Sequence, residues 1–300
     1  MVLSVVVSTL NDREQLLSCL DALTERTPPR TEVIVVNGPS SDGTTGVVRE
    51  RTDVDVLVEI SERSPNVSRN AGLEAATGDI VAFLDGACTV EPGWYDAIER
   101  SLETEVDIVS GPITGRKTTV DDLGHTRTVA GRSVTPFDAD NVAFDRTVLD
   151  ALDGFDEYLD VGGDRDCAHR VAGLGFEVDW CGEMAVRSEI EADGGTTQSE
   201  WGSAYRSLSY RLAKNYGPRP TVLIRTVASA VRDGVFGVRR IFSGDVTPTG
   251  WVSDGIEVLT NVACGARDGL RARYADRSAR RNPNGISVRH DRAVRLYDWR

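Results

Sequence analysis

Hydrophobic positions in the first quarter of the chain recur in short runs separated by helical patterns. The β-branched runs over 4–9 and 31–37 contain little polar alternation, which is typical of strands covered on both faces. Between them, the leucines over 16–23 recur at helical spacing, and Asp12 and Gln15 have the spacing of a capping box at the start of that helix. This order of strand, helix and strand predicts βαβ units and a mostly parallel sheet.

The run over 80–85, Ile-Val-Ala-Phe-Leu-Asp, is a further buried strand and stops on an acid, Asp85. In open α/β sheets, ligands bind beyond the carboxyl ends of the strands, so Asp85 is placed to meet a metal, a phosphate or a ribose. The alternative is that Asp85 only begins a turn before Gly86, and the stretch by itself favours neither interpretation.

The last third of the chain has a different pattern. Residues 201–216 predict an amphipathic helix, and 221–242 are apolar but interrupted by arginines, which makes them too charged for a membrane-spanning helix. Two alternatives stay open for this region: a helix lying on a membrane surface, or a helical pair packed on the preceding domain. The polar, Arg-rich stretch over 275–284 is expected to be exposed or disordered.

Three parts are therefore expected. They are a main domain over 1–198, a helical and basic region over 199–274, and an Arg-rich tail over 275–300. The long aperiodic segment over 112–138 is interpreted as a loop at the entrance of an acceptor substrate.

Composition narrows the cellular setting. The five cysteines among 300 residues never form a Cys-x-x-Cys pair, so neither a disulfide framework nor a zinc ribbon is expected, and a reduced intracellular compartment fits best. The start of the chain lacks a basic region before its first apolar run, so we expect no signal peptide, and no stretch is apolar enough for a transmembrane helix.

Charge excludes some partners and indicates others. A net charge of −13 argues against general nucleic-acid binding, which requires basic surface. Lys117 and Lys214 are the only lysines, and arginine with abundant aspartate is typical of proteins from salt-loving microbes. Residues 200–300 carry 18 basic and 9 acidic side chains, whereas the preceding residues carry 16 and 38. A basic region of this kind needs an anionic partner.

Several blocks in register carry a family resemblance. The segments over 4–11, 32–44, 68–78 and 80–85, followed by those over 140–146, 154–157 and 162–166, resemble the successive motifs of family 2 inverting glycosyltransferases with the GT-A fold. The match covers roughly residues 2–190. It implies a Rossmann-like, mostly parallel mixed sheet flanked by helices, with a C-terminal helical extension.

The resemblance also implies a site for a nucleotide-diphosphate sugar. Six residues at the ends of these blocks would bind it: Thr9, Asn11, Asn37, Arg69, Asp85 and Asn141. Asn37 stands where the family usually has an aspartate that binds uracil, and an amide oxygen can still accept a hydrogen bond. Asn11 has a second interpretation as a helix cap. Arg69 suits a diphosphate, and Asn141 is expected to face the donor sugar.

The expected metal site departs from the family pattern. The Asp-x-Asp motif becomes Asp85-Gly86-Ala87, so Asp85 is the single candidate ligand for Mg2+ or Mn2+. A cation bound mainly through phosphate oxygens needs only one or two protein carboxylates. Metal dependence is therefore in doubt, and Arg187 is an alternative source of positive charge for the diphosphate.

An inverting reaction needs a carboxylate that deprotonates the acceptor. In Gly162-Gly163-Asp164-Arg165-Asp166 the family's Glu-Asp pair becomes Gly163-Asp164, so the resemblance implies Asp164 as the base, with Asp166 as the second candidate. The alternative is that both acids only begin a helix, where negative charge is favourable.

The function implied is transfer of a hexose or hexuronic acid from the nucleotide sugar to a lipid-linked glycan on polyprenyl or dolichol phosphate. The chain is similar to archaeal enzymes of protein N-glycosylation for the surface layer, and it would be peripheral on the cytoplasmic face of the membrane. The alternative is a non-catalytic homologue that binds nucleotide sugar or partners another transferase. A dinucleotide oxidoreductase is disfavoured because no Gly-x-Gly-x-x-Gly follows the first strand.

Overall fold

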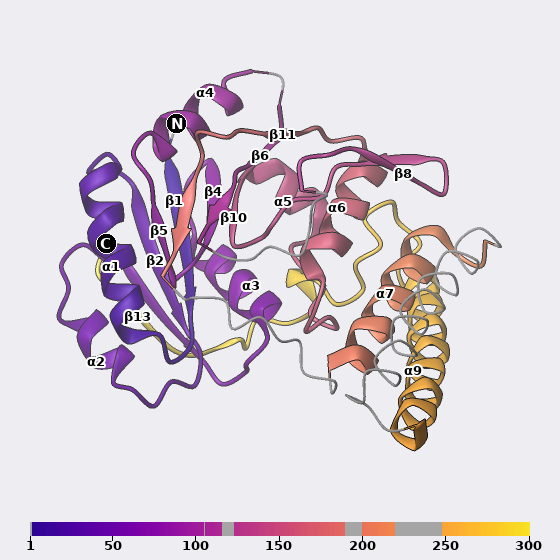
Figure 1. Cartoon of the computed structure of the whole chain (residues 1–300). Helices are drawn as coiled ribbons and strands as arrows, with labels where there is room; N and C mark the ends of the chain where they lie inside the picture. The colour runs from indigo at the N-terminus through magenta and orange to yellow at the C-terminus, as the bar shows by residue number, and fades with distance from the viewer. Residues whose placement is uncertain (1, 105, 116–122, 190–199, 220–247) are drawn as a thin grey trace.

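An eight-stranded mixed sheet forms the centre of the protein in a computed structural model of the chain, which describes residues 2–104, 106–115, 123–189, 200–219 and 248–300 (Figure 1). In chain order the strands of the sheet are β1 (Leu3–Thr9), β2 (Glu32–Asn37), β3 (Val56–Ile60), β4 (Ile80–Asp85), β6 (Ile108–Ser110), β10 (Asn141–Asp145), β11 (Val178–Trp180) and β13 (Ala293–Asp298). Their spatial order is β11-β6-β10-β4-β1-β2-β3-β13. Strands β10 and β13 run antiparallel to their neighbours, and the other pairs are parallel. The predicted α/β class and mostly parallel sheet are confirmed.

Helices cover both faces of this sheet. In the main domain they are α1 (Arg13–Arg26), α2 (Thr44–Arg49), α3 (Pro65–Ala75), α4 (Trp94–Leu102), α5 (Arg146–Leu152) and α6 (Gly163–Leu174). Smaller elements are β5 (Cys88–Val90), β7 (Ile113–Thr114) and β12 (Val186–Ser188), which form a three-stranded sheet, the hairpin of β8 (Arg127–Val129) and β9 (Arg132–Val134), and the 3-10 turn η1 (Ile286–Val288).

Side chains of alternate residues in β1 point into two separate cores. Val5 and Val7 pack with Leu16 of α1, whereas Val6 belongs to the core on the other face. There a Cβ atom at position 72 would lie 2.2 Å from Val6 Cγ1, so Gly72 allows α3 to pack directly on the sheet. The fully buried strands explain the absence of polar alternation in the sequence.

Two long helices stand to one side of the sheet: α7 (Glu200–Tyr216) and α9 (Pro248–Ala275), which pack side by side (Figure 1). Leu212 and Tyr216 of α7 join the main core, so this pair packs on the preceding domain, as one of the two alternatives predicted. None of the helices in the described ranges is both long enough and apolar enough to cross a bilayer. The amphipathic segment predicted over 221–242 lies outside the described residues.

The chain after α9 returns to the sheet instead of forming a tail. Strand β13 pairs with β3 at the sheet edge, and Asn282 and Arg292 are buried. Arg292 binds Glu74 of α3 and Glu157, which fixes the connection to the main domain. Within 275–284, Ala275, Arg277, Ser278 and Ala279 are exposed, as expected, whereas Asn282 is buried and its amide donates to backbone carbonyls of the main domain.

Candidate active site

The register of the central strands brings predicted residues to one edge of the sheet. Ser8 of β1 lies opposite Asp85 of β4, and Thr9 lies opposite Asn37 of β2. All these positions are at the carboxyl ends of parallel strands, where ligands of open α/β sheets bind.

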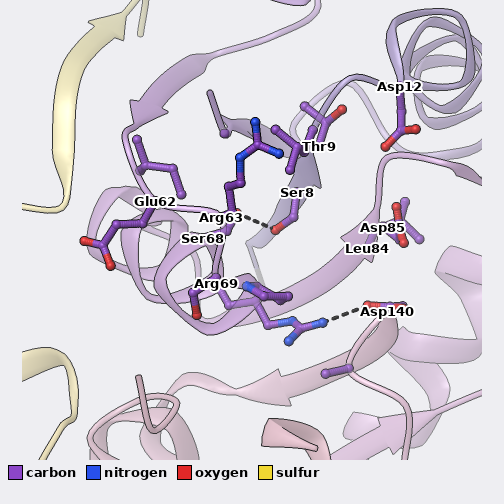
Figure 2. Close-up of a pocket in the computed structure, with 16 residues that line it drawn as sticks. Ser8, Thr9, Asp12, Glu62, Arg63, Ser68, Arg69, Leu84, Asp85 and Asp140 are labelled. Carbon is purple, nitrogen blue, oxygen red and sulfur yellow. Dashed lines mark hydrogen bonds and ion pairs between the residues drawn. The ribbon is translucent and has the colours of Figure 1, made fainter. Parts of the chain in front are cut away.

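A cavity of about 290 Å3 opens at this edge (Figure 2). It is lined by Ser8, Thr9, Leu10, Asp12, Gly38, Ile60, Glu62, Arg63, Ser64, Pro65, Ser68, Arg69, Leu84, Asp85, Ala139 and Asp140. Three of the residues implied by the resemblance, Thr9, Arg69 and Asp85, therefore share one cavity. The other five do not line it: Asn11, Asn37, Asn141, Asp164 and Asp166.

Two acids and one arginine form the polar floor of the cavity. Asp85 Oδ1 accepts a hydrogen bond from the Ala87 N–H at 2.9 Å, and the Asp85 N–H donates to the Asp140 carbonyl at 3.2 Å. Arg69 binds Asp140 Oδ1 at 2.7 Å, and its guanidinium lies 5.5 Å from the centre of the Phe155 ring. The arginine thus offsets one of the two neighbouring negative charges, and its position is fixed before any ligand binds.

Two residues of the cavity lining have a buried hydroxyl group without a hydrogen-bond partner among the described residues. They are Thr9, through Oγ1, and Ser64, through Oγ. Buried polar groups in proteins are almost always paired, so unpaired hydroxyls in lining residues are consistent with bonds that form when a ligand binds.

Four charged residues of the cavity were not found by sequence reasoning: Asp12, Glu62, Arg63 and Asp140. Asp140 comes directly before β10, which runs antiparallel to β4. The start of β10 therefore lies beside the end of β4, where Asp85 is found. Burial raises the pKa of Asp12, and the negative charge of Asp42 adds to the shift.

Asn11 and Asn37 hold neighbouring loops in place. Asn11 adopts a left-handed φ of 59°, and its Oδ1 accepts a hydrogen bond from the Ser41 N–H at 2.8 Å. The buried Asn37 accepts from Ser40 and donates to Thr45. Neither amide points into the cavity, so a contact with the nucleotide stays a prediction for both residues.

Asn141 does not occupy the position expected for a contact with the donor sugar. Its side chain is fully buried, Oδ1 accepts from Trp94 Nε1 at 2.9 Å, and Nδ2 donates to the Met184 carbonyl at 2.7 Å. Both ends of the amide are paired inside the protein. Its polar character is explained by these bonds, which tie β10 to α4 and to the loop before β12.

Asp164 lies half-buried in the first turn of α6 and does not line the cavity. The neighbouring Gly163 abuts Asn66, and a side chain there would stand 2.2 Å from Asn66 Nδ2. Asn66 Oδ1 in turn accepts from Arg69 of the cavity at 3.2 Å. Asn66 thus connects the start of α6 to Arg69 of the cavity. The close contact between Gly163 and Asn66 leaves no room for the glutamate that the family has at this position.

Asp166, two residues after Asp164, lies in the protein interior and has a structural role. Its carboxylate is fully buried and binds Lys214 at 2.7 Å, Arg170 at 2.9 Å and Asn215 at 2.8 Å. Although burial opposes ionisation, the charges of Lys214 and Arg170 hold the pKa of Asp166 below its usual value. A buried, ion-paired carboxylate of this kind is out of reach of an acceptor, which argues against the second candidate for the base.

Protein ligands for a divalent cation are sparse. No cluster of three or more potential metal ligands is found in the ranges that the structure describes. Asp85 is the only one of the cavity's four carboxylates that the sequence predicted as a ligand, and one carboxylate fits a cation held mainly by phosphate oxygens and water. Arg187, the alternative cation, is exposed on β12 beside Glu91 and Glu189 and does not line the cavity.

Together, the sheet topology and the polar cavity at its carboxyl edge are typical of an α/β protein that binds its ligand beyond the ends of parallel strands. The family model of glycosyl transferase family 2 matches residues 4–156, which is just over half of the chain. The protein therefore belongs to glycosyl transferase family 2, as the sequence blocks implied.

Relatives and solved structures agree with this family. The chain is 33% identical to glycosyltransferase AglE of Haloferax volcanii over 117 residues, which cover 37% of this chain and 38% of AglE. It is 28% identical to putative glycosyltransferase EpsH of Bacillus subtilis over 109 residues, covering 35% and 32% of the two chains. The matches thus span less than half the length of these relatives.

Two solved structures share the fold. Mannosyltransferase PcManGT from Pyrobaculum calidifontis, in complex with GDP-Man and Mn2+, has a TM-score of 0.59 at 18% identity and covers 89% of this chain and 87% of its own. Staphylococcus aureus TarS 1-349, in complex with UDP-GlcNAc, has a TM-score of 0.60 at 17% identity, covering 91% and 90%.

Proposed function

We propose that this protein is an inverting glycosyltransferase that uses a nucleotide-diphosphate sugar as donor. The observation that carries the proposal is the cavity at the carboxyl edge of the sheet, where Thr9, Arg69 and Asp85 meet in a member of glycosyl transferase family 2. Arg69 supplies positive charge for the diphosphate, and the unpaired Thr9 hydroxyl supplies a hydrogen bond to the nucleotide.

A divalent cation fits this site through Asp85, with the diphosphate and water as the remaining ligands. When bound, it would stabilise the negative charge of the departing diphosphate. Asp140 stays paired with Arg69 and keeps the guanidinium directed at the cavity floor.

Asp164 is the proposed base. The acceptor hydroxyl attacks the anomeric carbon from the side opposite the diphosphate, the bond from that carbon to the diphosphate oxygen breaks, and the hydroxyl proton passes to the Asp164 carboxylate. The products are the inverted glycoside and the nucleoside diphosphate. Asp166 has no part in this step because its carboxylate is buried against Lys214 and Arg170.

For the acceptor we propose a glycan on polyprenyl or dolichol phosphate, and for the donor sugar a hexose or a hexuronic acid. The similarity to the haloarchaeal AglE and the arginine-rich, lysine-poor composition support a role in archaeal protein N-glycosylation for the surface layer. The lipid carrier would bring the enzyme to the cytoplasmic face of the membrane, with the basic C-terminal region against the anionic surface.

A turnover assay with purified protein tests the assignment of the base. Asp164→Asn should reduce sugar transfer by about 1,000-fold, within the range expected for loss of a general base, while calorimetry shows nearly unchanged donor binding. Asp160→Asn, a change at an exposed acid just before α6, serves as the matched control and should retain activity. An active Asp164→Asn variant refutes the role of Asp164.

A non-catalytic homologue is the second candidate. It is favoured by Ala87 in place of the second acid of the metal motif and by the tight contact that keeps a side chain out of position 163. Binding of a nucleotide sugar by the wild-type protein without turnover on any lipid-linked acceptor would support this candidate over the enzyme.

A further inference from the structure

Two arginines, Arg165 and Arg211, lie at the first turn of α6 outside the donor cavity, beside the acids Asp164 and Asp166 of that turn. Arg165 and Arg211 lie close enough to interact electrostatically with each other and with Asp164. The Arg211 guanidinium reaches Gly162, where a Cβ atom would stand 2.7 Å from Arg211 Nη1. Two arginines and the start of a 12-residue helix therefore converge on the same few residues.

Arg211 is an unusual arginine because it is buried and, among the described residues, forms no salt bridge, although Asp164 and Asp166 act on it electrostatically. Its residue is only 7% exposed, and its Nε has no hydrogen-bond partner. Neither Arg165 nor Arg211 makes a side-chain hydrogen bond or salt bridge to any residue in the described part of the chain. Burial lowers the pKa of Arg211 to about 10, and the nearby charges of Arg165 and Arg127 act in the same direction.

Neighbouring acids offset only part of this positive charge. Asp156 and Asp166, two buried carboxylates, already bind two buried cations, Lys214 and Arg170. Asp166 also attracts Arg211, and Asp164 is the remaining acid that acts on it. Holding an unbalanced, desolvated guanidinium is costly unless an anion binds to it.

The backbone at this place also favours an anion. Gly162 precedes α6 in a left-handed conformation, with φ of 74°, and no side chain caps the helix. The free N–H groups of the first turn carry partial positive charge and form an anion site when basic side chains are present. Val161, next to Gly162, is 51% exposed, so an exposed apolar side chain lies beside the start of α6.

We propose that Arg165, Arg211 and the first turn of α6 bind the phosphate of the acceptor, a phosphate ester on an isoprenoid chain. This inference rests on the proposed function, because it names a binding site for the acceptor substrate of that reaction. Because Arg165 follows Asp164 in the chain, the glycan that carries the attacking hydroxyl would extend from the bound phosphate towards Asp164. Val161 would contact the beginning of the apolar chain.

The test is calorimetry on the full chain with three probes: geranyl phosphate, inorganic phosphate and the nucleotides UDP and GDP. Arg165→Gln removes the half-buried arginine, and loss of one charge-assisted contact should weaken geranyl phosphate binding roughly tenfold or more. Nucleotide binding should stay within about twofold of the wild type, a change of only a few tenths of a kcal/mol. Arg271→Gln, at a position 70% exposed on α9, is the matched control and should change neither affinity.

Each contrary outcome has a separate meaning. Equal loss in Arg165→Gln and Arg271→Gln, or no loss in either, overturns the site. Loss of nucleotide affinity with unchanged geranyl phosphate binding assigns the arginines to the donor and overturns the acceptor assignment. Equal affinity for inorganic phosphate also overturns that assignment, since it leaves a site for free phosphate.

A second variant and an independent measurement complete the design. Arg211→Lys keeps the buried charge but loses the planar guanidinium, so it should bind geranyl phosphate more weakly than the wild type while thermal unfolding shows a folded protein. If wild-type protein binds neither nucleotide, the proposed transferase function fails, whereas the geranyl phosphate result still decides the phosphate site.

Discussion

Aspartates occur both at the sheet edge and at the junction of α6 with α7, yet the two regions use them in opposite ways. At the edge, Asp85 and Asp140 face a cavity, and Arg69 offsets one of the two charges. At the junction, Asp156 and Asp166 are sealed from solvent, and Lys214 binds both. The difference teaches that the surroundings of a carboxylate, more than its presence in a motif, separate a binding site from a structural contact.

The largest expected effect comes from breaking the buried junction. Lys214→Met leaves two buried carboxylates with one cation and should lower the free energy of unfolding by about 3–5 kcal/mol, measured by urea denaturation. Nucleotide binding at a temperature where the variant is folded should be retained. Arg267→Met, at a position 61% exposed on α9, is the control and should cost well under 1 kcal/mol. A similar loss in both variants would contradict the structural role of the junction.

The sheet edge should respond in the reverse manner. Asp85→Asn keeps an oxygen that accepts from the Ala87 N–H, so stability should change by less than about 1 kcal/mol. Sugar transfer should fall by about 100-fold, because the variant loses the negative charge that holds a cation at the diphosphate. Turnover and urea denaturation on the same preparation measure both quantities. If Asp85→Asn lowers stability as much as Lys214→Met does, the two regions do not differ as described.

The pH dependence of the free energy of unfolding provides a further comparison with a smaller expected effect. A carboxyl whose pKa is lower in the folded than in the unfolded state contributes stability above the unfolded pKa, and this contribution is lost as the pH falls through the folded value. Asp166 starts from an ordinary pKa of 3.8, so the free energy of unfolding should decline below about pH 4, at most by about 1.4 kcal/mol per pH unit from this group. Asp166→Asn should remove that part of the slope. Urea denaturation of both proteins between pH 3 and 6 measures the difference, and parallel curves would contradict it.

The fold and part of the site could be predicted because they depend on local patterns. Apolar runs identify buried strands, and strand ends place Thr9 and Asp85 at one edge without any knowledge of packing. The burial of the Asn141 amide could not be predicted, because its hydrogen-bond partners Trp94 and Met184 are distant in sequence. The cap of α1 shows the same limit: Asp12 makes no side-chain cap bond, and the Arg13 N–H donates instead to Asp42 at 3.0 Å.

Asp164 and Asp166 show why the base was harder to locate than the cavity. Both acids lie in the first turn of one helix, and the sequence offers the same helix-start interpretation for each. The buried partners of Asp166 separate them: Arg170, four residues on, and Lys214, 48 residues after it. A tertiary contact of this range leaves no local pattern, whereas a strand that ends on an acid does.

The pairing of β13 with β3 means that the basic C-terminal region is not a removable module. A chain shortened before α9 would lose its membrane-facing candidates together with the strand that covers β3, whose backbone groups would then be open to other chains. Aggregation of such a protein would mimic membrane association in a sedimentation assay. Localisation is therefore better probed by single substitutions on the outer face of α9, which leave the sheet edge protected.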